Sequence, residues 1–213
     1  ASVSFFHTTH SIPGSLGIDI HTPEGEVVYT GDFKFDPTAA PDYRTDMDRL
    51  AEIEQKGVLA LLSDSSNAEA SFPSASEQEI GQYVTDVFRN AKGRIIVAAK
   101  ASNLNRVQEV LNAAHATGKR VLLTGRDVAK IVRTAMKFGY LKVPKGLLMR
   151  VKDLKTTPDD KTVILETGRM GEPLNSLQKM AKKRHSMINI HKGDLVFIST
   201  TPSHAVETMV AQL

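Results

Sequence analysis

The chain has 213 residues, of which 41% are hydrophobic and 24% charged, with a formal net charge of +3 and no cysteine. This composition excludes a disordered chain, a disulfide-stabilised domain and a thiolate zinc site, so any metal ion would be bound by His, Asp or Glu. No apolar run approaches the about 18 residues of a membrane span and no export signal opens the chain, so we expect a cytoplasmic protein without membrane contact.

The first third of the chain reads as a small sheet with one helix. Residues 1–36 alternate short β-rich runs with turn signals such as Thr22-Pro23-Glu24-Gly25, which predicts antiparallel strands. Apolar residues at helical spacing within 37–56 predict a loop and a short amphipathic helix. The apolar run from Val58 to Leu62, followed by Ser63 and Asp64, predicts a buried strand with an acid at its carboxyl end.

The polar segment 65–76 separates two parts of opposite charge. Residues 1–75 carry 4 Lys and Arg against 12 Asp and Glu, and residues 76–213 carry 23 against 12, giving net charges of −8 and +11. An acidic part suits cation binding and a basic part suits a polyanion such as nucleic acid, although surface lysines can also serve solubility alone. We therefore predict two domains, residues 1–75 and 76–213.

The second part alternates helices with strands. Ser76 and Glu79 have the spacing of a capping box at a helix start. Strands are expected at 94–99, 120–123, 162–166 and 195–199, and helices at 103–117, 127–138, 173–183 and from 203. This alternation with short connections predicts an α/β fold with a parallel, doubly wound sheet.

Four segments that follow these strands could bind phosphates. The segments 100–103, 124–126, 167–172 and 199–202 offer hydroxyls, small residues or a cation at the expected carboxyl edge of the sheet. The same residue types are ordinary helix caps, so either role fits each segment. Neither glycine-rich nucleotide motif occurs in the chain, which argues against a small-molecule enzyme with a nucleotide in the crevice.

His10 and Asp32 are the strongest candidates for a metal site. Each follows a predicted strand, and the strand pair between them would bring an imidazole and a carboxylate to one sheet edge. Asp32 could instead form a turn, and Asp64 could cap the next element. His21, His115, His185, His191 and His204 lack metal-ligand spacing and are expected to be exposed.

Five short segments follow one another along the chain in a distinctive order. They are Thr9-His10-Ser11-Ile12-Pro13, Tyr29-Thr30-Gly31-Asp32-Phe33-Lys34-Phe35-Asp36, Leu62-Ser63-Asp64-Ser65-Ser66-Asn67-Ala68-Glu69, Ala101-Ser102-Asn103 and Thr167-Gly168-Arg169-Met170-Gly171-Glu172-Pro173. The series resembles bacterial RNase J, a β-CASP family of metallo-β-lactamase-fold nucleases. The resemblance covers essentially the whole chain. It implies part of a metallo-β-lactamase αββα sandwich in 1–75, then a Rossmann-like β-CASP domain with a parallel sheet in 76–213.

The resemblance also implies roles for individual residues. In that family the residue matching His10 is a zinc ligand, the one matching Asp32 bridges two zinc ions, and the one matching Asp64 is an acid close to the metals. Asp32 and Asp64 are accordingly expected to be catalytic. The residues expected to contact RNA phosphates are Ser102, Asn103, Arg106, Gly168, Arg169, Gly171, Ser199 and Thr201.

The chain also departs from the family pattern. The His-x-His-x-Asp-His cluster that supplies most metal ligands is not in this sequence, so the chain resembles an internal segment. Gly14 stands where the family has an acid, Asn105 where it has a histidine, and Arg169-Met170 where it has Ser-Gln. Arg169-Met170, together with Thr200-Thr201-Pro202-Ser203, resembles the second, weakly active RNase J paralogue of Gram-positive bacteria.

The leading hypothesis is therefore a segment of a zinc-dependent ribonuclease with 5′–3′ exonuclease and endonuclease activity in RNA maturation and decay. Its partners would be single-stranded RNA and copies of itself or an RNase J paralogue. We expect the segment alone to be inactive, because catalytic zinc usually has three protein ligands. The alternative is a non-catalytic subunit that binds RNA and assembles with the active paralogue.

Overall fold

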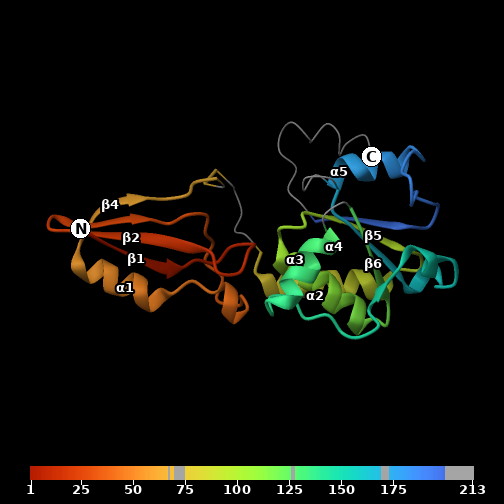
Figure 1. Ribbon diagram of the computed structural model, residues 1–213, viewed down its shortest axis with the longest axis horizontal. Helices are drawn as coiled ribbons and strands as arrows, with labels where there is room; N and C mark the ends of the chain where they lie inside the picture. Colours follow the sequence, from red (N-terminus) through yellow and green to blue (C-terminus); the bar gives the residue numbers. More distant parts are fainter. Residues whose placement is uncertain (67, 70–74, 126–127, 169–172, 200–213) are drawn as a thin grey trace. The chain divides into compact units, whose positions relative to one another are not determined.

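The computed structural model describes residues 1–66, 68–69, 75–125, 128–168 and 173–199. The chain divides into two compact units, Ala1–Ile80 and Gly81–Leu213 (Figure 1). Each unit is described by itself. In the described residues, no helix has the length and apolar character needed to cross a membrane.

The first unit is a four-stranded sheet with one long helix. Its strands, in the spatial order β1-β2-β3-β4, are β1 (Ser2–His7), β2 (Leu16–Thr22), β3 (Gly25–Tyr29) and β4 (Val58–Leu62). The first three strands pair antiparallel, as predicted, and β4 pairs parallel to β3. A parallel neighbour needs a long connection, which here contains the 3-10 helix η1 (Pro41–Tyr43) and the helix α1 (Met47–Lys56).

Strand alternation gives this sheet one covered face. Phe6, Val28 and Ile53 are at most 4% exposed and form the core between the sheet and α1, which runs along the sheet in Figure 1. Phe6 lies against Gly17, where an added Cβ would come within 2.2 Å of the ring. Neighbouring strand residues such as Phe5 point the other way and are exposed.

The burial predicted for β4 is wrong. All five residues of β4 are exposed, and Leu59 and Leu61 are 59% and 62% accessible. The strand lies at the end of the sheet and pairs only with β3, and nothing in the described residues covers its side chains. A continuous apolar run therefore predicts that the segment forms a strand, but it does not predict whether other segments cover that strand.

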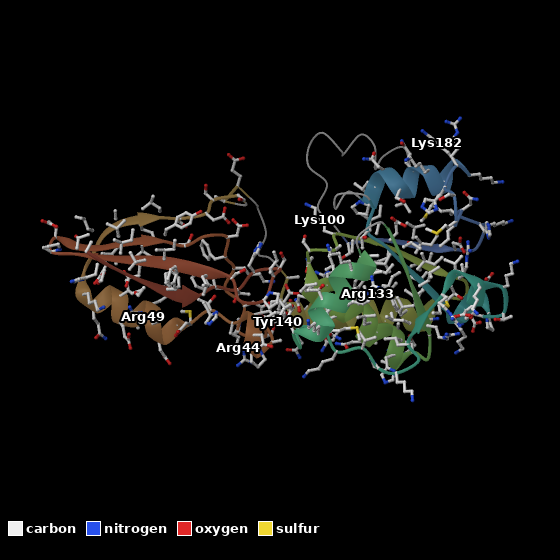
Figure 2. The ribbon with its side chains drawn as sticks, in the orientation of Figure 1. Arg44, Arg49, Lys100, Arg133, Tyr140 and Lys182 are labelled. Atoms are coloured by element: carbon white, nitrogen blue, oxygen red, sulfur yellow. The ribbon has the colours of Figure 1, made fainter. Side chains whose placement is uncertain are left out.

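A buried ionic network joins α1 to the sheet. Asp19 and Glu26 are 2% and 0% exposed, and Arg49 of α1 lies 3.2 Å from Asp19. Figure 2 shows Arg49 on this helix. The His21 Nδ1 atom lies 2.8 Å from Glu26 Oε1, and Lys56 Nζ lies 3.8 Å from the same oxygen. The hydrogen bond with His21 lowers the pKa of Glu26, although burial opposes it.

The second unit contains a five-stranded parallel sheet, as predicted. Its strands, in the spatial order β7-β6-β8-β5-β9, are β5 (Ile95–Ala99), β6 (Arg120–Thr124), β7 (Leu148–Met149), β8 (Thr162–Glu166) and β9 (Leu195–Ser199). The helices are α2 (Glu77–Asn90), α3 (Leu104–Ala116), α4 (Val128–Lys137) and α5 (Pro173–Ala181), with 3-10 turns η2 (Val151–Lys155) and η3 (Asp159–Lys161). The sequence did not predict β7 or the two turns, which are short.

Helices cover both faces of this sheet, with α5 on one side and α2, α3 and α4 on the other (Figure 1). Every residue of β5 and β8 is buried, as expected for strands with both faces covered. Ile96, Ile164 and Leu177 belong to the core beneath α5. At the amino edge, Arg94 forms a two-pronged ion pair with Asp194, which ties the starts of β5 and β9 together.

Two helix starts follow the predicted capping chemistry. Ser76 and Glu79 form the capping box reciprocally, because the Glu79 carboxylate accepts from Ser76 N–H and Ser76 Oγ accepts from Glu79 N–H. The Asn103 side chain caps α3 by accepting a 2.9 Å hydrogen bond from Arg106 N–H. The predicted helix from 203 lies outside the described residues.

Candidate active site

A large open hollow in the first unit contains the three candidate acid and imidazole groups. Its volume is about 840 Å³, and its lining includes His10, Asp32 and Asp64 together with Phe33 and Phe35. The two phenyl rings meet edge to face with centroids 5.3 Å apart. Polar groups that converge in one hollow are the usual arrangement of a ligand or active site.

His10 and Asp32 face each other across this hollow. Two contacts join their segments: Lys34 N–H donates to Thr9 O at 2.9 Å, and Thr8 Oγ1 donates to Asp32 O at 3.3 Å. The His10 Nε2 atom consequently lies 3.5 Å from Asp32 Oδ2, and 3.2 Å from Ser11 Oγ. The side chains are 33% and 70% exposed, so a ligand can reach both.

Asp64 enters the hollow from the carboxyl end of β4. Because β3 and β4 are parallel, their ends meet, and Asp64 N–H donates to Thr30 Oγ1 at 3.0 Å. The carboxylate also accepts hydrogen bonds from the Ser66 hydroxyl and backbone N–H. These bonds, with a smaller contribution from the His10 charge, lower the pKa of Asp64. Asp64 is therefore ionised at neutral pH.

The donor chemistry of His10 and Asp32 fits zinc, but their number is small. Imidazole nitrogen and carboxylate oxygen are ordinary zinc ligands, and catalytic sites usually use three of them plus water. In the ranges of the chain that the structure describes, no group of three or more His, Cys, Asp or Glu could hold a metal ion. His10 and Asp32 are thus two candidate ligands among the described residues.

Lys34, which also lines the hollow, connects its loop to the start of α2. Its ammonium lies 3.3 Å from Asp36 Oδ2 and donates to Glu77 Oε1 at 2.8 Å. Asp36 also accepts from Thr38 and from Glu77 N–H, at the first residue of α2. Burial acts to raise the pKa of Asp36, but these hydrogen bonds outweigh it and hold the pKa at about 2. The sequence prediction missed this cluster, although Lys34 and Asp36 stand in the same motif as Asp32.

The residues predicted to contact RNA lie in the second unit, after the carboxyl ends of its strands. Ser102 is exposed in the turn after β5. Asn103 uses its side-chain oxygen as the cap of α3, and Arg106 pairs with Glu109 and is 12% exposed. Of these three residues, only Ser102 presents a polar side chain that is both exposed and without an internal bond in the described structure.

Gly168 and Ser199 follow two further strands at the same edge. Gly168 comes two residues after β8 with φ of 68°, and its N–H donates to Glu166 Oε1 at 2.7 Å. Ser199 is the last residue of β9, which neighbours β5. The other predicted RNA contacts, Arg169, Gly171 and Thr201, lie outside the described residues.

A buried acid beneath this edge was not predicted. Glu166 is 1% exposed, and its Oε2 atom lies 4.0 Å from His185 Nε2. The His185 side chain is 12% exposed, so the expectation that it is a surface histidine is wrong. Its Nδ1 accepts N–H groups of Met187 and Ile188, which leaves Nε2 to carry the ring proton towards Glu166.

Gly125 brings a second strand end against this loop. It has φ of 116°, and an added Cβ would lie 2.6 Å from Thr167 Oγ1 and 3.0 Å from Gly168 O. Only a residue without a side chain permits this approach. The loops after β6 and β8 are therefore packed together at the carboxyl edge.

The chain is similar to known proteins along its whole length. The family model "Ribonuclease J, beta-CASP domain" matches residues 92–213. The protein named Ribonuclease J 2 is 56% identical in Streptococcus pyogenes serotype M3, 43% in Staphylococcus epidermidis and 41% in Staphylococcus aureus. Each match covers 99% of this chain and 38% of the relative.

Structural comparison agrees on the fold. A crystal structure of an Enterococcus faecalis V583 protein matches with a TM-score of 0.57 at 16% identity, covering 99% of this chain and 56% of that one. The chain spans about 38% of the length of the curated relatives it matches. With its family match, its parallel α/β second unit and its motifs in order, the chain belongs to the ribonuclease J family and carries the β-CASP domain of that family.

Proposed function

We propose that the protein to which this chain belongs hydrolyses RNA phosphodiester bonds with zinc, and that the 213-residue chain contributes only part of the active site. One observation supports this most directly. His10, Asp32 and Asp64 come from three segments of the chain and line one open hollow. The relatives are named Ribonuclease J 2, which agrees with RNA as the substrate.

Each of the three side chains has a distinct task in this proposal. His10 Nε2 and Asp32 Oδ2, which lie 3.5 Å apart, would each supply one metal ligand. When bound, zinc activates a water and stabilises the charge that develops on the phosphate. Asp64 is ionised at neutral pH, and its hydrogen bonds from Ser66 lower its pKa further, so it accepts hydrogen bonds and does not donate a proton.

The second unit would bind the RNA strand. Residues 76–213 carry a net charge of +11, which favours a polyanion. The carboxyl edge of the sheet presents Ser102, Gly168 and Ser199 where ligands of parallel sheets bind. We propose single-stranded RNA as the ligand, with both 5′–3′ exonuclease and endonuclease action, and assembly with another RNase J copy.

The test is RNA cleavage by the full-length protein with Asp32→Ala. We expect cleavage to fall by about 100-fold or more, because loss of a metal ligand exceeds the 10–100-fold cost of losing an outer partner. Asp42→Ala removes an exposed acid of the same unit that does not line the hollow, so it should cleave at the wild-type rate. Circular dichroism of both variants checks that they fold.

A second function is favoured by the small number of candidate metal ligands. In the described residues, no group of three or more His, Cys, Asp or Glu could hold a metal ion. This suits a subunit that binds RNA through its basic residues 76–213 and assembles with an active partner without cleaving. If Asp32→Ala leaves turnover unchanged, the nuclease proposal is wrong and this scaffold function is favoured.

A further inference from the structure

A second hollow lies at the opposite, amino edge of the five-stranded sheet. It has a volume of about 470 Å³ and is lined by residues from 88–92, 116–119 and 160–161. These segments lead directly into β5, β6 and β8, which are neighbours in the sheet. Ligands of parallel sheets usually bind at the carboxyl edge, so this hollow is separate from the predicted RNA-binding edge.

Three lysines line this hollow. They are Lys92, Lys119 and Lys161, and the lining contains one acid, Asp160. Arg89 also lines the hollow, but it pairs with Asp86 at 2.6 Å. In the part of the chain that is described, no carboxylate lies within 4.0 Å of any of the three ammonium groups. Two positive charges therefore remain after Asp160 is counted.

Lys119 is held in place inside the hollow. It is 6% exposed, whereas lysines are almost never fully buried without a partner. Its ammonium donates one hydrogen bond to the backbone carbonyl of Asp160, which leaves two N–H groups. Burial and the neighbouring charge of Lys161 lower the pKa of Lys119. An anion between the two lysines would relieve this repulsion.

Lys119 is not needed to cap α3, which ends beside it. Cations are often placed at helix carboxyl ends, where the last carbonyls are unsatisfied. Here the carbonyls of Ala113, Ala114 and His115 in α3 already accept N–H groups from the turn at 117–119. Capping of α3 therefore does not account for the buried ammonium of Lys119.

We propose that this hollow binds a phosphate-bearing anion, either a small phosphate compound or the phosphates of an RNA strand. Its volume falls in the range of small-molecule sites, about 300–1,000 Å³. Lysine binds phosphate as a flexible point charge, and three such groups supply several N–H donors around one anion. The proposal does not depend on the hydrolytic function of the other unit.

The first test measures binding of ADP to the full-length protein by calorimetry, without added divalent ions. Lys92→Glu combined with Lys161→Glu should weaken ADP binding at least tenfold, because both exposed side chains line the hollow. The control combines Lys137→Glu with Lys145→Glu, which makes the same charge change at exposed positions outside the hollow. The proposal fails if neither ADP nor RNA distinguishes the two double variants.

The second test identifies the source of the phosphate. RNA binding is measured against salt concentration, where each phosphate contact on a single strand contributes about 0.7 to the log–log slope. If RNA occupies the hollow, the Lys92/Lys161 variant should lose about 1.4 from the slope relative to the control variant. An unchanged slope with weakened ADP binding assigns the hollow to small phosphate compounds. Neither result requires RNA cleavage, so failure of the nuclease proposal is recognised separately.

Discussion

Asp36 connects the loop after β3 to the first turn of α2. Its carboxylate accepts hydrogen bonds from the backbone N–H and hydroxyl of Thr38 and from Glu77 N–H, and its side chain is 1% exposed. The folded state holds its pKa at about 2, below the ordinary value of 3.8. The stabilisation is therefore complete above about pH 4 and is lost as the pH falls towards 2.

Asp36→Asn should remove this pH-dependent stabilisation. The amide group cannot accept a hydrogen bond through its nitrogen, so one N–H of the cluster is left unsatisfied, at a cost of about 1–3 kcal/mol at neutral pH. The difference from wild type should shrink as the pH falls through about 2, because Asp36 then becomes protonated in the folded state as well as in the unfolded state. Urea unfolding at several pH values measures this. A variant difference that stays constant with pH would contradict it, and Asp42→Asn serves as the exposed control.

The sequence motifs predicted the locations of the candidate side chains better than their hydrogen-bond and ion-pair partners. His10 and Asp32 were expected at one sheet edge, and the family resemblance implied that Asp64 lies close to them. The structure places all three in one hollow. Asn103 and Arg106 were expected to contact phosphates, and in the structure their side chains bond to residues of α3. Both interactions join residues that are three positions apart, so they depend on residues outside the motif as well as on the motif itself. Their roles in RNA binding stay a prediction.

At the scale of elements, α1 depends on ions as well as on apolar packing. Arg49→Met should destabilise the first unit by about 3 kcal/mol or more, because it leaves Asp19 buried without its cation. The same substitution at Arg89 breaks an exposed pair with Asp86 and should cost less than about 1 kcal/mol. Chemical unfolding of both variants gives the comparison. Equal effects would show that the buried network does not stabilise α1.

The spacing of apolar residues predicted which segments form helices and which form strands, but it did not predict which strands are buried. The strands at 162–166 and 195–199 begin and end as predicted, and the predicted helices at 103–117 and 173–183 match α3 and α5 to within two residues at each end. β4 was read correctly as a strand, yet its side chains are exposed. Local sequence sets strand formation, but burial depends on which other segments cover the strand. The two-residue strand β7 is too short to produce a period.

For the molecule as a whole, the net charge changes from negative in residues 1–75 to positive in residues 76–213. We predicted metal binding for the acidic part and nucleic-acid binding for the basic part. The boundary between the two compact units falls after Ile80, and the family match begins at residue 92. The candidate metal ligands show how much of a site can be predicted from this segment alone. His10 and Asp32 could be identified as candidate ligands, and the described residues bring no third His, Cys, Asp or Glu into a metal-holding group with them.

The 213-residue chain, prepared alone and shown to be folded, should accordingly bind zinc weakly. Two ligands provide far less than the about 10 kcal/mol or more of a complete four-ligand site, so zinc should exchange readily. Competition with a chromophoric chelator measures this affinity, and His10→Gln should weaken it further while His115→Gln, an exposed histidine of the second unit, should not. The same preparation should leave single-stranded RNA uncleaved. Tight stoichiometric zinc binding together with RNA cleavage would show that this segment holds a complete active site.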